Sequence, residues 1–186
     1  MHLSWSHKLF LKINSCVGKN PRRDTIFYFF GFWLIYFCLF GFLGLSLFEI
    51  FFGDWFVGIF MMLVSFTACI FSFTLSYCIA FFWPHQRPEK ELPQVKKLFS
   101  TLGTWKSFPS DHTLVVSILA FAVASTGHSF FLSTIFFLAA FLVASGRVYS
   151  GVHYPRDVLG GFLFGGFSVF LVSFLFVKSV ASIFLD

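Results

Sequence analysis

Long uncharged segments divide this chain into runs of membrane-spanning length. Three of them cover residues 25–48, 55–84 and 158–177, and a longer one covers residues 113–146. A helix rises about 1.5 Å per residue, so about 20 apolar residues cross the roughly 30 Å hydrocarbon core of a bilayer. The longest run exceeds one span, and residues 125–129 inside it (Ser-Thr-Gly-His-Ser) are typical of a turn. The pattern therefore predicts five membrane-spanning helices, of which the third and fourth form a hairpin.

The first 24 residues follow a different pattern. Apolar side chains recur at helical spacing on one side, and polar ones on the other, namely Trp5, Leu9, Ile13, Cys16 and Val17 against Lys8, Lys12, Ser15 and Lys19. This arrangement predicts an amphipathic helix that lies on the membrane surface. A frayed basic tail is the alternative interpretation.

The composition agrees with a membrane protein and excludes a soluble one. Hydrophobic residues make up 58% of the chain and charged residues 11%, whereas a soluble domain is about 25% charged. We therefore expect one all-α domain over residues 1–186, a polytopic membrane helix bundle. In it a surface helix covers 1–24, helices one and two cover 25–83, a polar loop covers 84–111, and helices three to five cover 112–186.

The net charge of +5 is compatible with an anionic partner, but a chain this apolar is not expected to bind nucleic acid. The cysteines at positions 16, 38, 69 and 78 form no CxxC pair. We interpret them as small buried hydrophobic residues rather than as metal ligands.

Three polar clusters lie where the predicted helices end, at residues 83–88, 107–113 and 146–157. Helix two arrives at one membrane face, helix three leaves it, helix four returns and helix five leaves again, so all three clusters share that face. Polar side chains close to a bilayer are costly and indicate function. The residues that this topology brings together are Arg87, Ser110, His112, Arg147, His153 and Asp157.

These residue types suit the chemistry of a phosphate group. Planar arginine forks bind phosphate oxygens, and Ser110 lies at the expected N-cap of helix three, where free N–H groups favour an anion. A neutral histidine can attack phosphorus, and a protonated one can donate to a leaving oxygen. Pro155 suits the first turn of helix five, which lets Asp157 reach back and orient His153.

Each residue alone also has a simpler interpretation. A histidine can be a solvated loop residue, an arginine an interfacial anchor, Ser110 only a helix cap, and the lysines at 90, 96, 97 and 106 only loop charge. Two histidines and an aspartate also suit a metal ion, but the neighbouring arginines repel a cation and no metal-binding motif is present. We therefore expect no metal and no other cofactor.

Three motifs in this region resemble those of the type 2 phosphatidic-acid-phosphatase superfamily. They are Arg87-Pro88, the sequence Ser-Phe-Pro-Ser-Asp-His over residues 107–112, and Arg147 followed by His153 and Asp157. The resemblance covers about residues 80–165. It implies a metal-independent membrane lipid phosphatase.

The resemblance also implies a role for each motif residue. His153 attacks phosphorus and forms a phosphohistidine, Asp157 orients His153, and His112 protonates the leaving oxygen and then activates water. The phosphoryl oxygens are held by Arg87, Ser110 and Arg147.

Three positions depart from the family pattern. The family's first motif usually has a lysine at the position of Ala80, and we consider His85 and Lys106 as auxiliary residues in its place. Asp111 stands where glycine is common, and an acid beside a phosphate must point away or pair with a cation. Gly146 stands where serine is usual.

The first two departures and the N-terminal stretch resemble bacitracin-resistance-type undecaprenyl-diphosphate phosphatases. This implies hydrolysis of undecaprenyl diphosphate to undecaprenyl phosphate and phosphate in cell-envelope biogenesis. Another substrate of the same chemistry remains open: phosphatidic acid, phosphatidylglycerophosphate or a lipid A phosphate. A non-enzymatic transporter or assembly subunit is the alternative of another class. The sequence leaves the oligomeric state undetermined.

The charge distribution and the resemblance disagree on orientation. Of the 13 basic residues, twelve fall on the predicted active-site face and only Lys178 on the other, which by the positive-inside rule predicts a cytoplasmic site. The resemblance implies the outer face of the plasma membrane. We expect the outer face.

Overall fold

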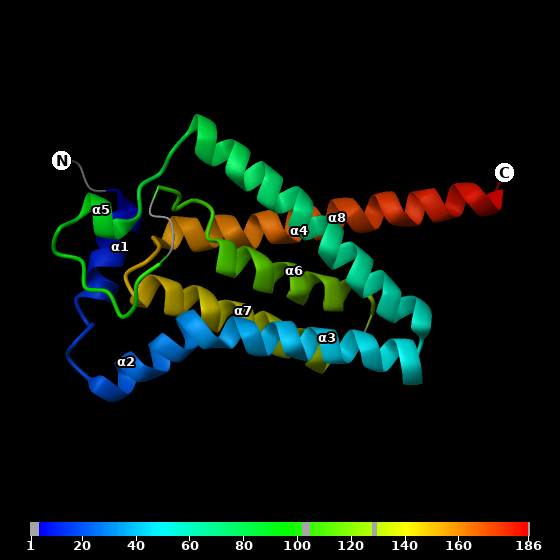
Figure 1. Cartoon of the computed structure of the whole chain (residues 1–186), viewed down its shortest axis with the longest axis horizontal. Helices are drawn as coiled ribbons and strands as arrows, with labels where there is room; N and C mark the ends of the chain where they lie inside the picture. The colour runs from blue at the N-terminus through cyan, green and yellow to red at the C-terminus, as the bar shows by residue number, and fades with distance from the viewer. Residues whose placement is uncertain (1–3, 102–104, 128–129, 186) are drawn as a thin grey trace.

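The structure, a computed structural model, describes residues 4–101, 105–127 and 130–185, and its regular elements there are all helices (Figure 1). In chain order they are α1 (Trp5–Asn14), α2 (Pro21–Tyr28), the π-helical η1 (Phe29–Trp33), α3 (Leu34–Phe52), α4 (Trp55–Phe82), α5 (Pro88–Glu91), α6 (Asp111–Ser125), α7 (Phe130–Tyr149) and α8 (Pro155–Leu185).

The membrane-length helices agree with the predicted spans. Four segments are long and apolar enough to cross a bilayer: Pro21–Phe52, Trp55–Phe82, Phe130–Tyr149 and Pro155–Val180. The remaining predicted helix, helix three, is α6, an apolar helix too short for that class. Because α6 ends at Ser125 and α7 begins at Phe130, the predicted hairpin is present, and the described chain is a membrane-embedded helix bundle.

The first long helix begins four residues earlier than its uncharged run. Asn20 is its N-cap, since the Asn20 side chain accepts a hydrogen bond from the Arg23 amide at 3.2 Å, and Pro21 occupies the first turn. Proline suits that position because its missing N–H would be unpaired there in any case. Local capping therefore starts the helix at Pro21, before the charge of Asp24.

Helix α6 is the centre of the bundle. It packs against α3, α4, α7 and α8, and nine of its 15 residues are buried. Its length of about 22 Å falls short of the bilayer core, so the longer helices enclose it. The closest packing is on α8, where a Cβ added to Gly161 would lie 2.7 Å from the Ser110 carbonyl oxygen. Glycine at that position thus lets the two helix starts approach.

The predicted surface helix is present as α1. It covers only Trp5–Asn14, and its apolar side is not wholly exposed as predicted. Its lysines are exposed, as are Trp5 and Leu9, while Phe10 is fully buried. Phe10 packs with Leu92 of the polar loop and with Val148 and Tyr154. The apolar side of α1 is therefore divided between an exposed edge and a face that supports the loop.

The cysteines only partly match their prediction. All four are free, but only Cys38 is buried; Cys16 and Cys69 are partly exposed and Cys78 is exposed on α4. An apolar stretch does not distinguish a helix face turned to lipid from one turned to protein, since both are hydrophobic.

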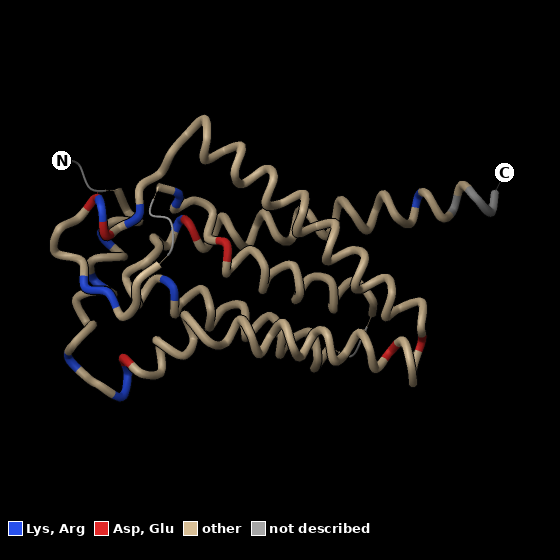
Figure 2. Tube along the Cα trace, in the orientation of Figure 1, with Lys and Arg blue, Asp and Glu red and all other residues tan. Residues whose placement is uncertain are grey.

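Charged residues gather at one end of the bundle, as Figure 2 shows. Lys and Arg residues cluster around α1, α5 and the starts of α2 and α8. The opposite end carries Glu49 and Asp54, with Lys178 on the projecting part of α8. The described parts of the polar loop, residues 84–101 and 105–110, lie at the basic end, together with the start of α6.

Candidate active site

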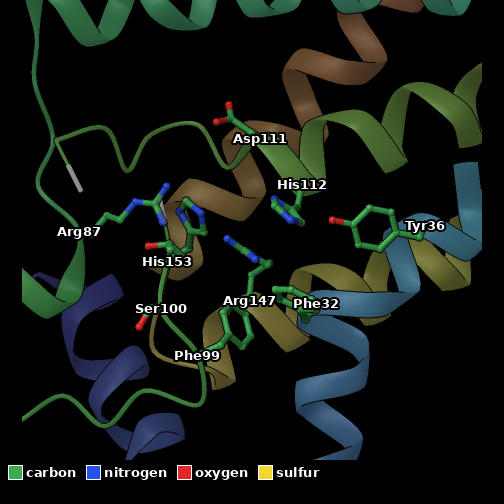
Figure 3. A pocket seen from close by; sticks show the side chains of 10 residues that line it. Phe32, Tyr36, Arg87, Phe99, Ser100, Asp111, His112, Arg147 and His153 are labelled. Carbon is green, nitrogen blue, oxygen red and sulfur yellow. The ribbon is translucent and has the colours of Figure 1, made fainter. Parts of the chain in front are cut away.

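A cavity of about 320 Å³ opens at the basic end of the bundle (Figure 3). All three polar clusters of the sequence contribute to its wall, together with η1, α3 and the loop before α6. Its lining residues are Phe32, Tyr36, Arg87, Phe99, Ser100, Thr101, Asp111, His112, Arg147 and His153. Both candidate histidines and both candidate arginines thus face one space.

His153 is held by a backbone carbonyl. It lies in the turn between α7 and α8, and its Nδ1 is 3.0 Å from the carbonyl oxygen of Ser107. A carbonyl can only accept a hydrogen bond, so Nδ1 carries the proton and Nε2 keeps its lone pair. Burial lowers the pKa of His153 to about 4, although Asp157 acts in the opposite direction. The ring is therefore neutral at pH 7.

Asp157 orients His153 less directly than the sequence analysis predicts. The Asp157 Oδ2 atom lies 3.7 Å from Nδ1 of His153, which is too long for a hydrogen bond. The same oxygen accepts hydrogen bonds from the Ser107 hydroxyl at 2.5 Å and the Tyr154 amide at 2.9 Å. Asp157 therefore fixes Ser107, and the Ser107 carbonyl fixes the imidazole.

The two arginines are buried with unused donors. Arg87 Nε donates to the Lys106 carbonyl and Arg147 Nη1 donates to the Gly31 carbonyl, each at 3.0 Å. Arg87 Nη1 and Arg147 Nε are buried and have no hydrogen-bond partner within the described part of the chain. Burial lowers the pKa of Arg87, with Asp111 and Glu89 acting against it. Buried donors without partners are rare, so these two atoms indicate an anion site.

The carbonyl that holds Arg147 belongs to the π-helical η1. A π-helical turn interrupts the i→i−4 pattern, and such turns are frequent at functional sites. Gly146 lies against this turn, and a Cβ at Gly146 would lie 2.3 Å from the Gly31 nitrogen. The departure from serine at this position therefore has a steric reason.

Asp111 pairs with a cation, as its place beside a phosphate site requires. Its carboxylate forms an ion pair with the Lys106 ammonium, which also donates to the Pro109 carbonyl at 3.3 Å and lies over the Tyr77 ring. Lys106 is buried but is not among the cavity's lining residues. Its charge neutralises Asp111 at the edge of the site.

Three more predicted residues, Asp157, His85 and Ser110, also lie outside the cavity wall. His85 Nδ1 lies 2.9 Å from the Trp83 carbonyl and its ring packs beside Phe108. Ser110 is the N-cap of α6 but makes no side-chain cap; its amide donates to the Asp157 carbonyl at 2.9 Å. Ser110 therefore joins the starts of α6 and α8.

Five lining residues were absent from the predicted set. Phe99, Ser100 and Thr101 belong to the polar loop, and Phe32 and Tyr36 belong to the first long helix. Tyr36 offers the one weak signal, a hydroxyl in an apolar run; the others have none. No group of three or more His, Cys, Asp or Glu residues suited to a metal ion occurs among the described residues.

Comparison with known proteins identifies relatives of this arrangement. A family model described as PAP2 superfamily matches residues 59–180. The chain is 37% identical over 90 residues to the bacitracin transport permease protein BcrC of Bacillus licheniformis, covering 46% of this chain and 41% of that protein. It is 40% identical over 65 residues to an undecaprenyl-diphosphatase of Sulfolobus acidocaldarius, covering 35% and 31%. These matches confirm the predicted resemblance, although the chain spans less than half the length of these curated relatives.

The fold has a solved counterpart. The crystal structure of LpxE from Aquifex aeolicus superimposes with a TM-score of 0.74 at 28% identity, covering 91% of this chain and 95% of that chain. The likeness therefore extends over nearly the whole bundle, including the helices outside the matched family region.

Proposed function

Because the chain belongs to the PAP2 superfamily, we propose that it is a membrane lipid phosphatase with His153 as its nucleophile. One observation carries the proposal: two imidazoles and two arginines line one cavity, and both buried guanidinium groups have a donor without a partner. A tetrahedral phosphate offers the oxygens that such donors require. The apolar bundle supports a substrate that is itself embedded in the membrane.

In the first step Nε2 of His153 attacks the terminal phosphorus, and the bond from that phosphorus to the lipid oxygen breaks. His112 takes up a proton when the anionic phosphate binds beside it and gives that proton to the leaving oxygen, which is worth roughly 10²–10⁴-fold in rate. Arg87 and Arg147 stabilise the charge on the three equatorial oxygens. The positive charge that develops on the His153 ring is stabilised by the Ser107 carbonyl at Nδ1–H and by the nearby Asp157 carboxylate.

In the second step water attacks the phosphohistidine. His112 is now neutral and takes a proton from the water, whose oxygen bonds to phosphorus as the bond to His153 breaks. Inorganic phosphate leaves, His153 regains its lone pair on Nε2, and His112 is protonated again. Nothing in this cycle requires a metal ion.

For the substrate we propose undecaprenyl diphosphate, which is converted to undecaprenyl phosphate and phosphate. The name of the Sulfolobus relative and the match to BcrC support this lipid over other phosphates. The Asp111–Lys106 pair leaves the cavity edge without a free negative charge, which suits any of the candidate phosphate lipids.

A phosphate-release assay in EDTA tests the activity and the substrate together. Purified protein is offered undecaprenyl diphosphate, phosphatidic acid, phosphatidylglycerophosphate and a lipid A phosphate. We expect release from the first, at least tenfold faster than from the others, and a loss of more than 10³-fold in His153→Ala. His85→Ala, at a partly exposed residue outside the cavity wall, is the matched control and should retain activity. Unchanged turnover in His153→Ala would remove the proposed nucleophile.

We further propose that the cavity faces the outside of the plasma membrane. The family resemblance supports this face, and the basic end of the bundle argues for the other, because positive charge favours the cytoplasm. The N-terminal lysines account for much of that charge.

Single cysteines at the two ends test the orientation. In a background in which all four native cysteines are replaced by serine, Lys90→Cys and Lys178→Cys are labelled in intact cells with a membrane-impermeant thiol reagent. Both lysines are exposed. We expect labelling at position 90 and protection at position 178; the reverse would place the site in the cytoplasm.

A further inference from the structure

We propose that Tyr36 connects the phosphate cavity to a groove for the lipid tail, and that its hydroxyl donates a hydrogen bond to the phosphate that leaves with the lipid. This inference rests on the lipid-phosphatase function proposed above. It adds a substrate-contacting residue in α3, which none of the three motifs contains.

Tyr36 borders two spaces at once. It lines the phosphate cavity, and it also lines an apolar groove of about 420 Å³ on the outer side of α3. No other residue lines both of these spaces in the described chain. Figure 3 shows the Tyr36 hydroxyl directed into the cavity, on the side of His112 away from His153. A leaving group protonated by His112 would therefore pass Tyr36 as it extends from phosphorus.

The groove suits a hydrocarbon chain. Its walls are α3 and α4, with residues such as Leu39, Leu43 and Met62, and Leu119 of α6 forms its floor. From Tyr36 to Leu43 the groove follows α3 for about 10 Å towards the opposite membrane face. Residues on its rim are open to the lipid, since Phe40 is 72% exposed. The first part of a polyprenyl chain can lie in the groove while the remainder lies among the membrane lipids.

A larger apolar groove elsewhere is the rival for the tail. It has a volume of about 590 Å³ and lies between α1, α7 and α8, with Ala144 and Leu159 among its lining residues. None of its residues lines the phosphate cavity. A lipid with its phosphate at His153 would have to cross α7 to reach it. The groove at Tyr36 is continuous with the phosphate cavity and the larger groove is not, so the groove at Tyr36 is the favoured site for the lipid tail.

The chemistry of a diphosphate explains what the hydroxyl would do. When the bond from the terminal phosphorus breaks, the second phosphate leaves with the lipid and takes the proton from His112 on the bridging oxygen. Its remaining oxygens are still charged and lie on the tail side of His112. A Tyr36 O–H bond to one of them is charge-assisted and strengthens as the bond breaks, so it lowers the barrier.

Two variants and two chain lengths test the proposal. Phosphate release is measured from undecaprenyl diphosphate and from the short, soluble dimethylallyl diphosphate. For Tyr36→Phe we expect kcat to fall about 10- to 100-fold on both substrates, with KM changed less than threefold. For Cys69→Trp, which fills the groove from α4, we expect KM for the long lipid to rise at least tenfold and turnover of the short one to stay within twofold.

Matched tryptophan variants provide the controls. Cys78→Trp places the same side chain on an exposed site of the same helix, and Ala144→Trp fills the rival groove. Both should behave as wild type on both lipids. A selective loss of the long lipid in Ala144→Trp, or none in Cys69→Trp, would overturn the tail groove, and an unchanged kcat in Tyr36→Phe would overturn the hydroxyl contact. Wild type without phosphate release would instead refute the proposed function.

Discussion

One hydrogen bond determines which nitrogen of His153 can react. The Ser107 carbonyl lies 3.0 Å from Nδ1 and can only accept, so the lone pair lies on Nε2. Burial lowers the pKa of His153 to about 4, below the value of about 6.5 for a free histidine. The ring is therefore neutral at pH 7, and as the proposed nucleophile it needs no separate base.

The protonation of His153 can be measured directly. We expect ¹⁵N NMR of histidine-labelled protein in micelles to show a neutral ring with the proton on Nδ1 at pH 6, titrating near pH 4. Because the folded-state pKa is depressed, protonation favours the unfolded state, so stability is lost as pH falls from about 6.5 through 4. His153→Gln identifies the resonance and should flatten this pH dependence. A midpoint near 6.5 would contradict the burial argument.

The Asp111–Lys106 pair keeps a carboxylate compatible with a phosphate site. Lys106→Met should leave Asp111 uncompensated beside the bound anion, and we expect KM to rise about tenfold with little change in kcat. Adding Asp111→Asn removes the charge and should restore KM to within about threefold of wild type. Steady-state kinetics of the two single variants and the double variant measure this coupling. A double variant no better than Lys106→Met would contradict the role of the pair.

At the scale of elements, the contact between η1 and α7 positions Arg147. The Gly31 carbonyl accepts from Arg147, and Gly146 lies so close that an added Cβ would be 2.3 Å from the Gly31 nitrogen. Gly146→Ser would restore the usual family residue, yet we expect it to destabilise this chain by about 1–3 kcal/mol and to lower kcat. Ser145→Ala, next to it and only partly buried, is the control for thermal unfolding in detergent. Wild-type stability of Gly146→Ser would contradict the close packing.

Helix α1 holds the loop that forms one wall of the cavity. The Asn14 side chain donates to the Lys96 carbonyl at 2.7 Å and accepts from the Lys96 amide at 2.9 Å. Three residues later Phe99 packs under the Arg147 guanidinium. The interfacial helix therefore supports a residue that touches the anion site.

Removing this support should loosen the loop. We expect Asn14→Ala to cost about 1–3 kcal/mol, the value of two hydrogen bonds, and to speed proteolysis within residues 93–101. The adjacent Ser15→Ala, whose hydroxyl bonds only to the Lys12 carbonyl of its own helix, should have no such effect. Equal proteolysis of both variants would remove α1 from the account.

At the scale of the whole molecule, the bundle surrounds a short helix with longer ones. Because α6 is enclosed by α3, α4, α7 and α8, its first turn and the turn before α8 meet at the basic end. Most of the charged residues lie at that end (Figure 2), as do the loop and the cavity, and many large apolar side chains are exposed along the helices. This asymmetry suits a reaction at the boundary between lipid and water.

Much of this arrangement follows from the sequence. Uncharged runs indicate the long helices, and because helices three and four carry the chain across the membrane and back, residues 87, 112, 147 and 153 must share a face. The membrane face on which each loop lies depends only on the order of the helices, so an error of a few residues in a predicted helix end does not change it. The start at Pro21 was missed because capping by Asn20 outweighs the charge of Asp24.

The remaining features depend on three-dimensional contacts that no motif encodes. The Ser107 bond to His153 uses a backbone carbonyl, which every residue possesses, so the sequence suggests Asp157 instead. Tyr36 lies in an apolar run, and only the rotation of α3 brings it to the cavity. The π-helical turn at η1 depends on packing against Gly146.

Trapping the covalent intermediate tests the central claim most directly. Undecaprenyl diphosphate labelled in its terminal phosphate is mixed rapidly with the protein in EDTA, quenched in base, and the labelled peptide is mapped. The account predicts an acid-labile, base-stable label on the peptide that contains His153, and none in His153→Ala. Continued phosphate release by His153→Ala, with no labelled peptide in the wild type, would contradict it.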